Sequence, residues 1–264
     1  MPTKKHLGQH WLKDRYVLDH IADCADVGPD DVVLEVGPGL GTLTSVLLAR
    51  AKKVIAVEFD KDLARKLPGQ FPGKNLDVVH SDILEFDMRG LPEGYKVVAN
   101  IPYYITSKII QKFMTSEHKP SVVTLLIQKE VAERVAAAPG NMSILAIGAQ
   151  LYADASLGDV VPAEFFTPPP KVDSQVVTLR TRPATLPVGV DEQLIFRLVK
   201  AGFSAKRKKL RTSIGGGLGI DKAQVEVLLR EANISPDDRA EALSIEQWKN
   251  FAAVYSARHR DSVT

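Results

Sequence analysis

Apolar and polar positions follow two different periods along the first two thirds of the chain. Short continuous apolar runs are typical of buried strands, and the stretches between them have the 3.6-residue spacing of amphipathic helices. The apolar runs predict strands at residues 31–37, 52–60, 75–82, 95–102, 121–128, 155–162 and 174–182. The intervening spacing predicts helices at residues 14–27, 37–50 (opened by a glycine turn), 61–67, 105–116, 129–140 and 142–154.

This alternation of strands and helices places the chain in the α/β class. It implies a parallel sheet wound with right-handed crossovers, with the strands at 155–162 and 174–182 as a closing pair. Prolines and a glycine then interrupt any period, which predicts a linker at residues 183–190. We therefore expect a first domain at residues 1–182.

The segments after the linker have helical spacing alone, and they predict a small all-α domain at residues 191–264. Its helices are expected at residues 191–203, 206–214, 221–233 and 244–259. The glycine run Gly215–Gly219 is similar to a phosphate loop, but it follows a helix and no lysine comes directly after it. We interpret it as a helix stop and a turn.

Composition narrows the class of protein further. The hydrophobic fraction of 45% and the charged fraction of 25% are ordinary for a globular chain. Cys24, the one cysteine, can form neither a disulfide nor a thiolate metal cluster, so we expect a reducing, cytoplasmic location and no metal site.

The first residues lack the apolar core of a signal peptide, and no run is long enough to span a bilayer. We expect a monomer without a membrane partner.

The net charge of +2 does not by itself indicate a nucleic-acid partner, but the basic residues are unevenly distributed. Five of them fall within six positions of the second domain: Lys206, Arg207, Lys208, Lys209 and Arg211. On a helix they would form a positive surface for a phosphate backbone. A solvated helix face is the alternative, and the residues alone leave both interpretations open.

The first indication of a ligand-binding site is the glycine turn at the end of the strand 31–37. Gly37, Gly39 and Gly41 follow Glu35 there, and glycines permit positive φ and close approach of the backbone to a ligand. The spacing differs from the dinucleotide pattern, in which the third glycine comes one residue later. The amides at such a helix start can bind a pyrophosphate or an amino-acid carboxylate.

Acidic residues end the next two strands. Glu58 is placed to accept hydrogen bonds from both hydroxyls of a ribose, and Asp82 is placed to accept one from an adenine amine. Either acid alone is more often a helix N-cap, as we expect for Asp60. Together with the glycine turn they predict a Rossmann-like sheet that binds S-adenosylmethionine. A nicotinamide oxidoreductase is the rival, and it would require the other glycine spacing.

The fourth strand ends in Asn100-Ile101-Pro102-Tyr103, beside the expected methyl donor. The Asn100 side-chain oxygen and the Ile101 carbonyl offer a pair of acceptors for the exocyclic amine of a nucleobase, and Pro102 fixes the turn. Because asparagine is not a base, catalysis would come from positioning and electrostatics. Tyr103 would stack on a base that has left its helix.

A second aromatic clamp is available in the segment "AEFFTPPPKVDS", where Pro168–Pro170 stiffen an extended loop. One of the two phenylalanines before the prolines belongs to the core. We expect Phe166, nearer the proline run, to stack on the base opposite Tyr103, and Phe165 to be the core residue.

Together these motifs resemble the ribosomal RNA adenine N6,N6-dimethyltransferases, specifically the small-subunit enzymes of the kasugamycin-resistance type. The resemblance covers nearly the whole chain. It rests on "HLGQHWL", "LEVGPGLGTLT", "VIAVEFD", "HSDIL", "ANIPYYITSKI", "LLIQKEVAERV", "FFTPPPKVDSQVV", "GFSAKRKKLRTSI" and "RAEALSIEQW". The chain departs from the family at His10-Trp11, where Asn-Phe is usual, and at Tyr104, where Asn is common.

The resemblance implies an S-adenosylmethionine-dependent enzyme that dimethylates two adjacent adenines in the 3′-terminal hairpin of 16S, or small-subunit, ribosomal RNA. It implies base contacts at Asn100, Tyr103 and Phe166. The cofactor contacts that it implies are His10, Leu12, Gly37, Gly39, Glu58, Asp82 and Asn100. It also favours a role in RNA binding for the basic residues 206–211. The remaining alternatives are a large-subunit methyltransferase of the macrolide-resistance type and a ribosome assembly factor without catalysis.

Overall fold

The computed structural model describes residues 10–260. The chain divides into two compact units, of which one comprises Met1–Ala136 with Tyr152–Arg182 and the other Ala137–Leu151 with Pro183–Thr264. The segment 137–151, which we expected within the first domain, therefore groups with the second unit. Hydrogen bonds explain this, because the backbone N–H groups of Gly140 and Met142 donate to the Glu241 carbonyl over 2.8 and 3.1 Å.

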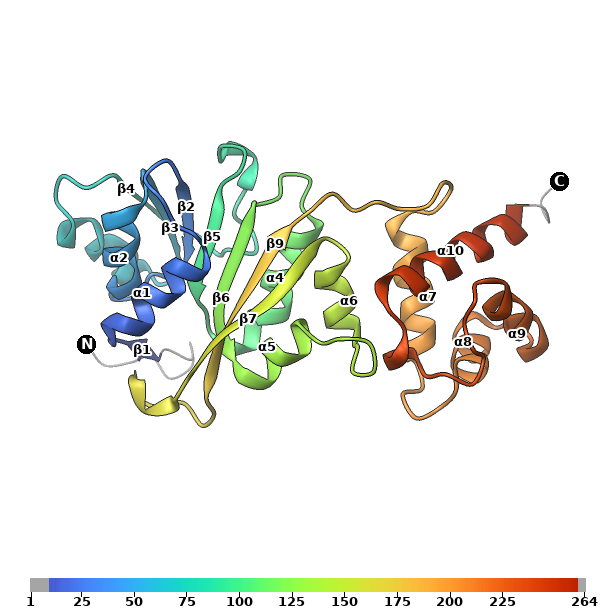
Figure 1. Cartoon of the computed structure of the whole chain (residues 1–264). Helices are drawn as coiled ribbons and strands as arrows, with labels where there is room; N and C mark the ends of the chain where they lie inside the picture. Colours follow the sequence, from blue (N-terminus) through green and yellow to red (C-terminus); the bar gives the residue numbers. More distant parts are fainter. Residues whose placement is uncertain (1–9, 261–264) are drawn as a thin grey trace. The chain divides into compact units, whose positions relative to one another are not determined.

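The first unit is built on a seven-stranded sheet with the strand order β4-β3-β2-β5-β6-β9-β7 (Figure 1). The first five strands in this order are parallel, and β9 and β7 complete the sheet as an antiparallel pair. The strands are β2 (Val32–Val36), β3 (Lys53–Glu58), β4 (Leu76–His80), β5 (Lys96–Asn100), β6 (Val122–Gln128), β7 (Ala153–Val161) and β9 (Ser174–Thr181). The prediction of an α/β sheet closed by two final strands is confirmed.

Two very short strands form a separate ladder. In it β1 (Trp11–Leu12) pairs antiparallel with β8 (Phe166–Thr167), so that Leu12 lies opposite Phe166. Both of these residues are almost fully buried in the core. The segment before the first helix is thereby tied to the segment after β7.

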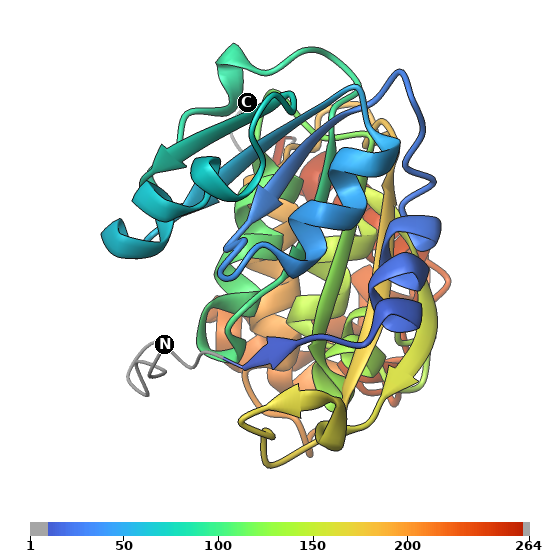
Figure 2. The ribbon, with the colours of Figure 1, turned by 90° about the vertical axis from the view of Figure 1, so that its left-hand side faces the viewer.

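Helices cover both faces of the sheet. Figure 2 shows α1 and α2, in blue, on one side of the strands and α4, in green, on the other. The helices of the first unit are α1 (Arg15–Cys24), α2 (Thr42–Arg50), α3 (Lys61–Lys66), α4 (Thr106–Thr115) and α5 (Lys129–Val135). Apolar side chains of α1 and α2 pack against alternate residues of the central strands, among them Val33, Val54 and Val98.

Capping side chains start two of these helices, α1 and α3, where the sequence indicates. Asp14 Oδ1 accepts a hydrogen bond from the Val17 N–H over 3.0 Å at the start of α1. Asp60 caps α3 in the same way through the Asp62 and Leu63 N–H groups. Such caps satisfy N–H groups that have no partner within the helix.

The second unit is all-helical, as predicted, and Trp248 lies at its centre with 1% of its surface exposed. Its helices are α6 (Ile144–Gln150), α7 (Glu192–Phe203), α8 (Leu210–Leu218), α9 (Lys222–Glu231) and α10 (Ile245–Arg260). Several helix boundaries differ from the prediction, among them those of α6 and α8. Helix α6 ends at Gln150, before strand β7, and α8 begins only at Leu210.

The interpretation of Gly215–Gly219 as a helix stop is wrong for its first four residues. Helix α8 continues to Leu218, and the chain turns at Gly219, which has a φ of +71°. A Cβ atom on Gly217 would lie 2.6 Å from Ala201 Cα of α7. Gly217 therefore lets the two helix backbones approach closely, which compensates for its poor helix propensity.

Within residues 10–260, no helix is both long and apolar enough to cross a membrane.

Candidate active site

A cavity of about 360 Å³ lies at the carboxyl ends of the parallel strands. Open α/β sheets place ligands at this edge. The cavity brings together residues that the sequence analysis singled out on five separate segments: His10, Leu12, Gly37, Gly39, Glu58, Asp82, Asn100, Ile101 and Pro102. Its volume falls within the range of ordinary small-molecule sites.

The glycine turn forms one wall of the cavity, with Gly37 and Gly39 at φ values of +65° and +58°. A Cβ atom on Gly39 would lie 2.3 Å from Cζ3 of the Trp11 ring. This position needs glycine for two reasons, because the backbone is left-handed and strand β1 lies directly against it. The turn and the N-terminal strand thus form one continuous surface.

Glu58 ends β3 and is held by two backbone donors. Its Oε2 accepts from the Gly39 N–H over 3.0 Å, and its Oε1 accepts from the Asp60 N–H over 2.8 Å. Burial raises the pKa of the Glu58 carboxyl, and these two hydrogen bonds act in the opposite direction. Each carboxylate oxygen keeps a second lone pair, so the group can still accept from two hydroxyls of a ligand.

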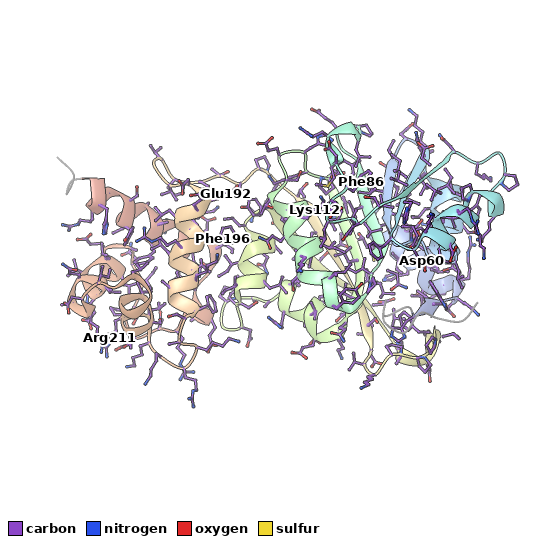
Figure 3. The ribbon with its side chains drawn as sticks, turned by 180° about the vertical axis from the view of Figure 1, so that it is seen from behind. Asp60, Phe86, Lys112, Glu192, Phe196 and Arg211 are labelled. Atoms are coloured by element: carbon purple, nitrogen blue, oxygen red, sulfur yellow. The ribbon has the colours of Figure 1, made fainter. Side chains whose placement is uncertain are left out.

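Asp82 lies in the turn after β4, and its Oδ1 accepts from the Leu84 N–H over 2.9 Å. Its Oδ2 accepts no hydrogen bond from residues 10–260 and remains available to a ligand. Lys112 of α4 fixes the same turn, because its Nζ donates to the carbonyls of Leu84 and Phe86, both over 2.9 Å. Lys112 and Phe86 are labelled next to each other in Figure 3.

Asn100 is the last residue of β5 and lines the cavity with its side chain half-buried. Within the described part of the chain, the Asn100 amide has no hydrogen-bond partner. Pro102 follows with φ and ψ of −59° and 137°, and a single 3₁₀ turn from Tyr103 to Ile105 leads into α4. A polar amide is therefore presented to the cavity on a rigid turn. The side chain of Tyr103 lies outside the described part of the structure.

His10 and Leu12 reach the cavity from either side of Trp11. The Nδ1 atom of His10 lies 2.7 Å from the Pro168 carbonyl oxygen, which links the N-terminal strand to the proline-rich loop. The Leu12 side chain is 1% exposed and belongs to both the cavity wall and the core.

Glu35 is a cavity residue to which the sequence analysis gave no role. It lies one residue before the end of β2 with 1% of its surface exposed, and neither carboxylate oxygen has a donor within hydrogen-bond distance and angle among the described residues. The Thr44 hydroxyl of α2 is also unpartnered. Burial raises the pKa of Glu35 to about 8, the nearby hydroxyl and N–H of Thr44 act in the opposite direction, and the negative charge of Glu58 adds to the effect of burial. The sequence contains one signal that could have identified Glu35 as a site residue, namely an acidic residue within the otherwise apolar strand β2.

The comparisons with known proteins agree with this arrangement. The family model for the ribosomal RNA adenine dimethylases matches residues 2–256. The chain belongs to this family. A ribosomal RNA small subunit methyltransferase A from Dehalococcoides mccartyi is 44% identical over 258 residues, which cover 96% of this chain and 89% of the relative. Another protein of that name, from a Nostoc species, is 40% identical over 94% of this chain and 96% of its own.

Solved structures of related enzymes share the fold. A dimethyladenosine transferase from Plasmodium falciparum has a TM-score of 0.82 and 27% identity, over 95% of this chain and 98% of its own. The 23S rRNA methyltransferase ErmE has a TM-score of 0.76 and 29% identity, over 92% of this chain and 98% of its own. The predicted Rossmann-like methyltransferase fold and the predicted rRNA adenine dimethyltransferase activity of the family are confirmed.

The stacking role expected of Phe166 stays a prediction, and the structure shows where the side chain lies without a base. This side chain is 3% exposed, lies opposite Leu12 in the short β1–β8 ladder and packs in the core beneath α1. Phe165, which we expected in the core, is 40% exposed. The two neighbours are exchanged because β8 begins at Phe166, and strand pairing turns this residue inward.

The structure also corrects the predicted helical location of the basic residues 206–211. Lys206, Arg207 and Lys208 are exposed in the turn between α7 and α8, not on a helix. Lys209 Nζ and Arg211 Nη1 are bound to Asp237 Oδ1 over 3.0 and 2.8 Å. Arg211 also binds Glu226. Two of the five charges are therefore partly neutralised, whereas the first three face solvent.

Proposed function

We propose that the chain transfers methyl groups from S-adenosylmethionine to the N6 amines of two adjacent adenines in the 3′-terminal hairpin of small-subunit ribosomal RNA. The order of groups along the cavity carries this proposal. Four residues lie at the carboxyl ends of β4, β3, β2 and β5, which are neighbours in the sheet: Asp82, Glu58, Gly37 and Asn100. A cofactor that extends across these strand ends would leave its reactive group beside Asn100.

The residues present fit such a cofactor. Glu58 offers two remaining lone pairs to the ribose hydroxyls, and Asp82 offers its free Oδ2 to the adenine amine. The backbone at Gly37 and Gly39 has no Cβ atoms and can lie against the amino-acid end. When bound, the cofactor supplies a methyl group on a positively charged sulfur.

Asn100 and Ile101 provide the acceptors for the target amine. The exocyclic nitrogen of adenine is a weak nucleophile because its lone pair is delocalised into the ring. Two acceptors, the Asn100 side-chain oxygen and the Ile101 carbonyl, would hold both N–H bonds and direct the nitrogen towards the methyl group. Asparagine takes up no proton, so the contribution of the chain is positioning and electrostatics. Tyr103 would stack on the flipped base.

The small-subunit substrate is supported by the relatives of the chain. Those at 37–44% identity are named as small subunit methyltransferases, whereas the structural relative named for 23S rRNA is 29% identical. Unpaired loop bases are also the bases that a protein can most readily turn out of a stack. The intact cavity argues against an assembly factor without catalysis.

The second unit is proposed to hold the RNA. Lys206, Arg207 and Lys208 are exposed together on one turn, where their charges can reach phosphates. Location in the cytoplasm and a monomeric state complete the proposal.

A methylation assay with defined substrates tests this function. The protein is incubated with labelled S-adenosylmethionine and either under-methylated small ribosomal subunits or naked large-subunit RNA, and the label is mapped. We expect N6-dimethyladenine at two adjacent positions of the small-subunit hairpin. Label in the large-subunit RNA alone would show the macrolide-resistance activity instead, and no label in either would refute the proposal.

Asn100 variants test the chemistry in the same assay under single-turnover conditions. Asn100→Ala removes the acceptor and should slow transfer by roughly 10²–10³-fold, the cost of losing one preorganised polar group. Asn100→Asp keeps an acceptor of the same shape and should retain partial activity. Lys108→Met, an exposed change on α4, is the control. Full activity of Asn100→Ala would exclude this mechanism.

A further inference from the structure

An aromatic side chain lies at the mouth of the cavity, and the proposed mechanism does not use it. Tyr104 lines the cavity together with Asn100 and Pro102, yet 66% of its surface is exposed. Among the described residues it makes no hydrogen bond and no contact with another ring. The ring is therefore open to a ligand at the entrance of the site.

The backbone holds Tyr104 in place from both sides. Ile101 before it and Thr106 after it are each 2% exposed. Between them the chain forms a single 3₁₀ turn, in which the Ile105 N–H donates to the Pro102 carbonyl over 3.4 Å. An aromatic ring on such a turn loses little conformational freedom when a ligand packs against it, and this favours binding.

Exposure alone does not make an aromatic residue a binding site, because single apolar side chains are common on protein surfaces. The position of Tyr104 distinguishes it from two other exposed rings. Tyr16 is 74% exposed, but it lies on α1 and is not among the described residues that line the cavity. Phe59 is 60% exposed and lines the cavity, but it follows Glu58 directly and belongs to the end where we place the ribose. Of these three rings, Tyr104 is the one at the end where the target amine is expected.

The covalent structure of RNA indicates what meets this ring. The exocyclic amine and the ribose lie at opposite ends of adenine, so a target whose amine reaches Asn100 has its ribose towards the mouth of the cavity. One phosphodiester joins that ribose to the next nucleotide, whose base has lost a stacking partner because the target has turned out. Aromatic side chains bind such bases by stacking, whatever the base, because every base has a π-face.

We propose that Tyr104 forms a second base subsite, on which the nucleobase next to the target stacks while the target amine lies at Asn100. This inference rests on the proposed function. The two target adenines are adjacent in the proposed substrate, so in at least one of the two rounds the base on Tyr104 is the other target. Tyr104 is then a positioning residue, which holds a neighbouring base through the face of its ring and does not touch the reacting atoms.

Methylation kinetics with the full chain, labelled S-adenosylmethionine and under-methylated small subunits test the proposal. For Tyr104→Ala we expect the KM for subunits to rise roughly tenfold, the effect of losing one stacked base, while the rate at saturation stays close to that of the wild type. A larger share of the subunits should carry methyl groups on one of the two adenines alone. Tyr104→Phe keeps the ring and should match the wild type in both respects. Tyr16→Ala is the control for the loss of an exposed aromatic side chain.

A change in the RNA tests the stacked base directly. Subunits are reconstituted with RNA in which one or the other of the two adenines is replaced by an abasic nucleotide. For at least one of these substrates, the wild type should show the raised KM of Tyr104→Ala. The variant should lose nothing further on that substrate, because two changes that remove the same interaction are not additive.

Three results overturn the inference and leave the proposed function standing. A wild-type KM in Tyr104→Ala, or for the wild type on both abasic substrates, shows that no base stacks on the ring. Equal losses in Tyr104→Phe and Tyr104→Ala assign the effect to the hydroxyl. A calorimetric affinity for S-adenosylmethionine that falls in Tyr104→Ala as much as the KM rises shows that the ring covers the cofactor instead.

Failure of the proposed function looks different, because the wild type then methylates neither adenine of the unaltered subunits, and both proposals fall together. The abasic substrates require only the wild-type protein. They therefore keep the test decisive even if Tyr104→Ala does not fold.

Discussion

Lys112 offers a quantitative test of how the end of the cavity at Asp82 is held. Its ammonium donates to two carbonyls of the turn that carries Asp82, those of Leu84 and Phe86. Lys112→Met keeps the length of the side chain and removes both hydrogen bonds. We predict that the turn loses its fixed conformation, that the protein is less stable and that the cofactor binds more weakly.

The structure sets the expected size of this effect. A hydrogen bond from a charged donor contributes about 1.5–3 kcal/mol when buried. The Lys112 side chain is only half-buried, and both carbonyls can regain water when it is removed, so the lower end applies. We expect the free energy of unfolding to fall by about 3 kcal/mol for the two bonds together. In the variant, the turn must be ordered when the cofactor binds. If this ordering takes about half of the lost free energy from the binding free energy, the cofactor dissociation constant rises roughly tenfold.

Three measurements check this prediction. Urea unfolding gives the change in stability, calorimetry gives the affinity for S-adenosylmethionine, and hydrogen exchange gives the protection of residues 81–87. Lys108→Met is the matched control, because Lys108 lies one turn earlier on α4, is exposed and makes no hydrogen bond with another described residue. Wild-type affinity and unchanged exchange in Lys112→Met would show that the lysine does not hold the turn.

Three further predictions follow from the site and the charges. Glu58→Ala should weaken cofactor binding by at least ~1.5–3 kcal/mol, the contribution of a charged hydrogen bond, and an unchanged dissociation constant in calorimetry would remove Glu58 from the ribose site. The triple variant Lys206→Ala/Arg207→Ala/Lys208→Ala should bind small subunits more weakly and with a flatter salt dependence, because fewer counterions are released; wild-type affinity and salt slope would leave these residues as a solvated surface. The raised pKa of Glu35, about 8 when folded against 4.5 unfolded, means that the folded protein holds a proton that the unfolded chain loses. The unfolding free energy of the ligand-free protein should therefore fall as pH rises through this window, by roughly 1.4 kcal/mol per pH unit, and urea unfolding of Glu35→Gln should show a flatter profile.

Local sequence signals determined the elements of this protein and the neighbourhood of its site. Continuous apolar runs such as 121–128 gave strands, and Asp14 and Asp60 gave helix starts, because capping and burial act over a few residues. Gly37, Glu58, Asp82 and Asn100 were predictable as one site because parallel strands bring their carboxyl ends to the same edge.

Tertiary contacts decided what these local signals leave open. Pairing of β8 with β1 turns Phe166 inward and leaves Phe165 outside, although the two are identical residues side by side. Close packing of Gly217 against Ala201 of α7 keeps this glycine within α8, against its own helix propensity. Burial on β2 places Glu35, an acidic residue, in the wall of the cavity. Each depends on residues distant in the chain, whose free energy of contact exceeds the local preference.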